Sequence, residues 1–189
     1  IAVGDYDIVE STGPGGLPIR HAVVRSVTAD QREVLDDTEA QLEFFESVFG
    51  PFPFDTYGLL VADSGPEFAL ETQTLTLLPS EWLTSFDPTS TSSVMAHELA
   101  HQWYGDKRNL RGWKHIWLNE GFATYAEWLW SEQEGTGTAQ QIFDSFYAIP
   151  PGSPFWDLRI GDPGPEALFD SPVYYRGAMT LHALRLQVG

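Results

Sequence analysis

The sequence predicts an α+β fold in which a small mixed sheet is followed by helices. Strand-like segments come first along the chain and helical patterns come later, which is the order typical of this class. The 189 residues are 42% hydrophobic and 14% aromatic, a globular composition with enough apolar surface for a substantial core. At this length the usual expectation is one domain.

The first part of the chain predicts two strands and a long helix. Strand-like stretches at 6–9 and 19–27 flank a turn rich in glycine and proline. A helix is expected over 29–48, because its apolar residues recur at helical spacing. Thr28 is suited to cap its first turn, and Gly50 is suited to end it. The seven acidic residues of this helix are expected to form a solvated face.

The remaining elements follow from the same patterns. Short apolar runs at 57–62 and 72–78 predict two further strands. A helix is expected over about 91–104, and a buried helix over 119–134, because the latter is apolar nearly all round. Shorter helices are expected at 139–148 and 173–186.

The charge and cysteine content exclude several classes of function. Ten basic and 27 acidic residues give a net charge of −17, which argues against nucleic acid and against an anionic membrane surface as partners. The absence of cysteine excludes disulfides, thiolate metal ligands and a cysteine nucleophile. No apolar run is long enough to span a bilayer. Both a secreted and a cytoplasmic location fit this composition.

The stretch H-E-L-A-H at residues 97–101 carries the clearest chemical signal. On a helix, His97 and His101 share one face about 6 Å apart along the axis, so that two imidazoles can bind one metal ion. Glu98 lies about 100° around the helix, where a base can act on a water molecule at the metal. The alternative is a helix with two partly buried histidines. The other histidines have no such pattern and are expected to be structural or exposed: His21, His115 and His182.

A zinc site needs a third protein ligand, and Glu120 is the candidate. It follows His101 after eighteen intervening residues and begins the buried apolar helix. A buried carboxylate needs a cationic partner, and the helix N-terminus favours its ionised form. Thr124, one turn later, is expected either to support a metal-bound imidazole or to be a buried threonine with its own hydrogen bond.

H-E-L-A-H, eighteen residues and then N-E-G-F-A resembles the gluzincin metallopeptidases, specifically the M1 aminopeptidases of the aminopeptidase N type. The resemblance covers nearly the whole chain. It implies a thermolysin-like catalytic domain, with one zinc ion (Zn²⁺) bound by His97, His101 and Glu120. It also implies hydrolysis of the N-terminal bond of peptides that have a free N-terminus, with Glu98 as general base.

Two further segments extend the resemblance. Residues 68–72, F-A-L-E-T, stand where the family has its exopeptidase motif G-A-M-E-N, and only Ala69 and Glu71 match it. This implies that Glu71 binds the α-ammonium group of the substrate. Residues 174–177, Y-Y-R-G, resemble the family's Y-E-K-G, which implies Tyr174 as the group that stabilises the oxyanion, with Tyr175 as its competitor.

Three other functions stay open at this point. The first is an endopeptidase with the same zinc centre, in which Glu71 binds no amine. The second is a bifunctional relative of the leukotriene hydrolase branch, with an added epoxide hydrolase activity. The third is a non-catalytic M1-like scaffold, which intact residues at 97, 98, 101 and 120 disfavour.

The resemblance also implies that residues 1–189 are a truncated catalytic domain. The family's N-terminal β domain and the C-terminal helical part are then absent, and these missing domains would be partners of the chain. From an open site of this kind we expect zinc binding with weak or absent aminopeptidase activity, together with some self-association.

Overall fold

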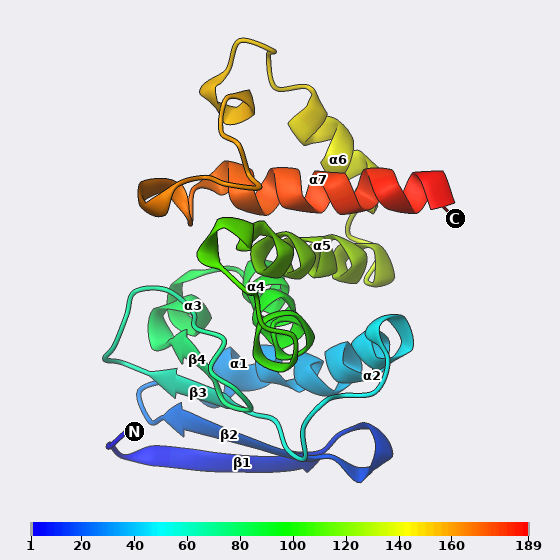
Figure 1. The fold of residues 1–189 in the computed structure, drawn as a ribbon. Helices are drawn as coiled ribbons and strands as arrows, with labels where there is room; N and C mark the ends of the chain where they lie inside the picture. The colour runs from blue at the N-terminus through cyan, green and yellow to red at the C-terminus, as the bar shows by residue number, and fades with distance from the viewer. Residues whose placement is uncertain (1, 189) are drawn as a thin grey trace. The chain divides into compact units, whose positions relative to one another are not determined.

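The computed structural model describes residues 2–188 (Figure 1). The chain forms two compact units, Ile1–Asp106 and Lys107–Gly189. Strands lie in the first unit and are followed by helices, so the predicted α+β class with a small mixed sheet is confirmed. Within the described residues, no helix is both long enough and apolar enough to cross a membrane.

The sheet of the first unit has its four described strands in the order β1-β2-β3-β4. β1 and β2 form an antiparallel hairpin, whereas β2 with β3 and β3 with β4 are parallel pairs. The register places Ala22 opposite Leu60, and Leu60 opposite Leu77. The strands are β1 (Tyr6–Thr12), β2 (Pro18–Val24), β3 (Leu59–Ala62) and β4 (Thr76–Pro79).

One face of this sheet is buried. Ile19, His21 and Val23 alternate along β2 and are all inaccessible, as are Leu59 and Val61 on β3. Because side chains alternate between the faces of a strand, these residues lie on one side of the sheet, the side on which the core forms. β1 is mostly exposed and forms the edge of the sheet.

The predicted helix over 29–48 is wrong in one respect, because it is broken into three pieces. These are α1 (Ala29–Arg32), a 3₁₀ turn at Glu33–Asp36, and α2 (Asp37–Phe49). The predicted ends are confirmed: Thr28 forms a capping box, and Gly50 ends α2 with a φ of 88°. A 3₁₀ turn changes apolar spacing by only a fraction of a residue per turn, so the pattern does not reveal the break.

The segment from the third strand to the helix that carries His97 also differs from expectation. The strand predicted over 72–78 begins only at Thr76, because the chain turns at 73–74. The short helix α3 (Ser80–Ser85) was not predicted. α4 (Pro88–Ala100) begins earlier than expected, because the Asp87 side chain accepts a hydrogen bond from the Ser90 N–H and caps it.

The second unit contains the three helices that the sequence predicts over 119–134, 139–148 and 173–186. They are α5 (Trp117–Gln133), α6 (Ala139–Tyr147) and α7 (Ser171–Val188), and the connection between α6 and α7 contains two short 3₁₀ turns. α5 and α7 lie side by side (Figure 1). Their backbones meet at Gly121 and Gly177, where a Cβ built on Gly121 would lie 2.8 Å from the Gly177 Cα.

Candidate metal centre and active site

The buried C-terminal half of α4, together with its C-cap residue His101, carries the H-E-L-A-H motif. His97, Glu98 and His101 are all buried, and His101 is 2% exposed. One ring nitrogen of His97 and one of His101 lie within 4.8 Å of each other. The two ring centroids are 4.9 Å apart at an interplanar angle of 72°. The spacing predicted from the helical repeat is therefore realised, and both imidazoles can reach one ion.

The backbone that follows α4 orients His101. After Ala100 the chain widens into a π-helical segment, Gln102–Lys107, in which the Asp106 N–H donates to the His101 carbonyl at 3.0 Å. His101 Nδ1 lies 3.1 Å from the Tyr104 carbonyl oxygen. A carbonyl only accepts, so Nδ1 carries the hydrogen, and Nε2 is the ring nitrogen that could bind a metal. No pattern in the sequence predicts the contact between His101 and the Tyr104 carbonyl. The sequence predicts only that the helix ends at Gly105.

Glu71 lies at the start of a turn beside β4. The preceding residue, Leu70, pairs with Leu77 through two backbone hydrogen bonds of 2.9 and 2.8 Å. Burial raises the pKa of Asp106, and the negative charge of Glu71 raises it further, whereas His101 and a hydrogen bond with Gln102 lower it. Two carboxyl groups near a histidine make this part of the first unit suited to a cationic group.

The second unit carries the other two predicted site residues. Glu120 lies in the first turn of α5 and is 5% exposed. Tyr174 lies in the first turn of α7 and is half-buried. Its competitor Tyr175 stacks on Phe146, with ring centroids 4.3 Å apart, and packs as a partly buried residue against the apolar cluster of this unit. That packing explains Tyr175 as a core residue and favours Tyr174 as the functional one.

Thr124 matches neither of its two expected roles. Its side chain is buried, yet its hydroxyl has no hydrogen-bond partner among residues 2–188. A buried hydroxyl of this kind is uncommon in folded proteins. The structure therefore gives no contact that would make Thr124 a support for a histidine ring.

Two of the remaining histidines have structural roles, as predicted. His21 is buried in β2, and its Nδ1 accepts the N–H of Leu59 in β3 at 3.1 Å. Burial lowers the pKa of His21 to about 4, against a smaller opposing effect of Asp36 and Glu39. His182 on α7 contacts the hydroxyl of Tyr125, also at 3.1 Å.

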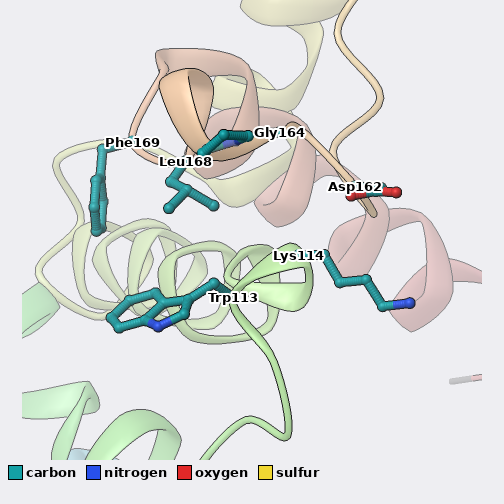
Figure 2. Close-up of a pocket in the computed structure, with 7 residues that line it drawn as sticks. Trp113, Lys114, Asp162, Gly164, Leu168 and Phe169 are labelled. Carbon is teal, nitrogen blue, oxygen red and sulfur yellow. The ribbon is translucent and has the colours of Figure 1, made fainter.

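The second unit also has a surface pocket of about 480 Å³, and none of the histidines described above lines it. Figure 2 shows the aromatic ring of Trp113 and that of Phe169 at one end, with Lys114 and Asp162 at the other. The centroids of the two rings are 6.5 Å apart. None of the site residues predicted from the sequence lines this pocket, which is formed by Trp113, Lys114, Asp162, Gly164, Pro165, Leu168 and Phe169.

Comparison with known proteins identifies the family. A model of the Peptidase family M1 domain matches residues 33–189. The chain belongs to peptidase family M1. Its M1 relatives include aminopeptidase N of Homo sapiens, 36% identical over 141 residues, which cover 67% of this chain and 14% of the human protein. A probable aminopeptidase 2 of Sulfurisphaera tokodaii is 28% identical, over 99% of this chain and 25% of that protein.

Solved M1 structures agree with this membership. A mutant form of the M1 zinc metallopeptidase from Deinococcus radiodurans, bound to a Tyr-Ser-Ala substrate, has a TM-score of 0.80 and 33% identity. The match covers 98% of this chain and 41% of that one. The form without the substitution has a TM-score of 0.77 over the same shares. The chain spans a quarter or less of the length of the two relatives named above, the human and the Sulfurisphaera tokodaii proteins.

Proposed function

We propose that this chain is the zinc-binding part of an M1 aminopeptidase, which removes the N-terminal residue from peptides. The observation that carries the proposal is the pair of buried imidazoles at the C-terminal end of α4, each of which offers one ring nitrogen to a metal, with His101 Nδ1 in contact with the Tyr104 carbonyl. Membership of the M1 family and the aminopeptidase names of its relatives support the same activity. No observation favours the endopeptidase, epoxide hydrolase or scaffold alternatives.

The residues present fit a zinc ion. We propose His97, His101 and Glu120 as the protein ligands, because each offers one nitrogen or oxygen atom of the kind that zinc binds. All three are buried, and a buried carboxylate such as that of Glu120 requires a cation or hydrogen bonds. A zinc ion held there supplies Lewis acidity, which polarises a carbonyl group and makes a water molecule more acidic.

Two side chains of the chain itself would act on the reacting atoms. Glu98, next to the first ligand on α4, is proposed to take the proton of the attacking water and to deliver it to the leaving amine. The hydroxyl of Tyr174 is proposed to donate a hydrogen bond to the oxygen of the scissile carbonyl as negative charge develops there. Burial of Glu98 limits competition from bulk water.

Recognition of the free N-terminus is assigned to Glu71. An α-ammonium group needs a carboxylate at a fixed distance from the reacting bond, so that only the first peptide bond is positioned for attack. The carboxyl of Asp106 close by adds negative charge to the same region. An acetylated N-terminus carries no positive charge and would lose this attraction.

The test compares free and blocked ligands on the zinc-loaded chain. We expect at most slow hydrolysis of leucine 4-nitroanilide, in line with the open site expected above, and none of its N-acetyl derivative. We also expect leucine hydroxamate to bind more tightly than N-acetyl-leucine hydroxamate in calorimetry, a readout that does not need turnover. Glu71→Gln should weaken binding of the free-amine ligand about 10- to 100-fold, because it removes a charged partner. Equal binding of both hydroxamates by the unsubstituted chain would refute the proposal.

A further inference from the structure

We propose that Gln102 is a positioning residue for the amine-binding carboxylate. Its side-chain amide holds the turn that begins at Glu71 against the segment that follows the metal-binding histidines. The inference rests on the function proposed above, since it gives Gln102 a part in the recognition of a free N-terminus. It concerns contacts within the first unit only.

The contacts of the amide are specific. The Gln102 side chain has no exposed surface. Its Oε1 accepts the N–H of Thr74 at 2.8 Å, and its Nε2 donates to the carbonyl of Glu71 at 3.3 Å. The orientation is forced, because a peptide N–H only donates and a carbonyl only accepts. A carboxylate or an apolar side chain of the same length could not satisfy both groups.

The turn that Gln102 holds is strained. Thr74 has a φ of 63°, a left-handed conformation that is unusual for a β-branched residue. Such a conformation persists only where the surrounding structure fixes it. The hydrogen bond from its own N–H to Gln102 is a restraint of this kind, and Leu75 N–H to the Thr72 carbonyl, at 3.0 Å, closes the turn. The backbone at Glu71 therefore depends on the Gln102 amide.

The backbone of Gln102 belongs to the segment next to the proposed metal ligands. It directly follows His101 and is the first residue of the π-helical segment. One side chain thus connects the carbonyl of Glu71 with the backbone next to a proposed metal ligand. The distance between the amine-binding carboxylate and the metal decides which peptide bond is cleaved, and a displacement of about 1 Å can cost about 100-fold in rate.

The test uses two buried glutamines of the same unit. Gln102→Met removes the amide and keeps an unbranched side chain of similar length. Gln41→Met is the matched control, because Gln41 is 1% exposed and its Nε2 donates to the Ser92 carbonyl at 2.9 Å. Both variants lose a buried hydrogen bond, so both should be less stable, and stability alone does not distinguish them.

The decisive readout is the preference for a free amine. With zinc bound, Gln102→Met should lose about 10-fold or more in affinity for leucine hydroxamate, and much less for N-acetyl-leucine hydroxamate. Its zinc content should stay unchanged. Hydrogen exchange of the Thr74 amide should be faster in Gln102→Met, because that amide loses its acceptor. Gln41→Met should keep both the preference and the slow exchange.

Two results would overturn the inference. The first is a Gln102→Met variant that prefers the free amine as strongly as the unsubstituted chain does. The second is an unchanged rate of hydrogen exchange at the Thr74 amide of that variant. Failure of the proposed function has a different signature, since the unsubstituted chain itself would then bind both hydroxamates equally. In that case there is no amine recognition for Gln102 to position, and the inference falls with it.

Discussion

The contact between His101 Nδ1 and the Tyr104 carbonyl determines which nitrogen of His101 would face a metal at the proposed site. The sequence motif predicts that the two histidines can share a metal, because i and i+4 positions share a helix face. It does not identify the carbonyl, since that contact depends on a π-helical segment that no side-chain pattern reports. The same holds for Gln102 and Asp106, whose partners at Glu71 and Thr74 are distant in sequence.

Substitution of Glu98 tests its proposed role as the base. Glu98→Gln preserves the shape of the side chain but removes its capacity to accept a proton. Loss of a general base typically costs about 10²–10⁴-fold in rate. We expect this loss with zinc content unchanged, measured by steady-state kinetics and metal analysis of the same sample. Near-normal turnover with stoichiometric zinc would remove Glu98 from the reaction.

The buried neutral His21 predicts a dependence of stability on pH. The pKa of His21 is about 4 when folded, against 6.5 ordinarily, because burial disfavours the charged form. Between these values the unfolded chain binds a proton that the folded chain does not, so the free energy of unfolding falls as the pH is lowered. From pH 7 to pH 4 this amounts to about 3 kcal/mol.

The control for this effect is His21→Asn, in which Oδ1 can replace Nδ1 as acceptor for the Leu59 N–H. Urea unfolding of both proteins at pH 7 and pH 4 measures the difference. The asparagine variant should lose less stability on acidification than the unsubstituted chain. An identical loss in both proteins would show that His21 titrates normally.

In the second unit, the sequence reveals where the helices lie but not where they pack against each other. The apolar patterns predict α5, α6 and α7 to within about two residues at most ends, because helices of this length have a strong periodic signal. The close approach of α5 and α7 is not visible in that pattern. Gly121 and Gly177 lie 56 positions apart in the chain, and only the structure shows that their backbones meet.

This contact gives a prediction for helix stability. A Cβ at Gly121 would lie 2.8 Å from the Gly177 Cα and 2.9 Å from its carbonyl carbon, and backbone atoms cannot move aside cheaply. Gly121→Ala should therefore destabilise the protein by about 1–3 kcal/mol, although alanine favours helices. Gly152→Ala is the control, because a Cβ added there would meet no atom within 4 Å. Thermal unfolding that ranks the two variants equally would contradict the close approach.

The three proposed zinc ligands, His97, His101 and Glu120, each offer one nitrogen or oxygen atom of the kind that zinc binds. Element order predicted the α+β class, which is confirmed, because the order of strands and helices is visible in the sequence. The ligand set read from the spacing of His97, His101 and Glu120 stays a proposal. The division into two units was not predicted. It depends on how contacts are distributed over the whole chain, which periodicity and motifs do not report.

Metal binding should therefore stabilise the folded chain. A ligand that binds only the native state adds about 2.7 kcal/mol at a concentration 100 times its Kd. Removal of zinc with a chelator should lower the midpoint of thermal unfolding, and added zinc should restore it. Glu120→Ala should show a much smaller shift on zinc addition, because one ligand is gone. An equal shift in both proteins would place the stabilising metal elsewhere.

Zinc content after dialysis against a mild chelator tests the central claim most directly. The unsubstituted chain should retain about one zinc ion per molecule, as expected for a site with three protein ligands. Glu120→Ala, measured alongside, should retain little, because two imidazoles alone bind zinc weakly. An unsubstituted chain without zinc would contradict the proposed metallopeptidase centre. Stoichiometric zinc in Glu120→Ala would contradict the ligand set.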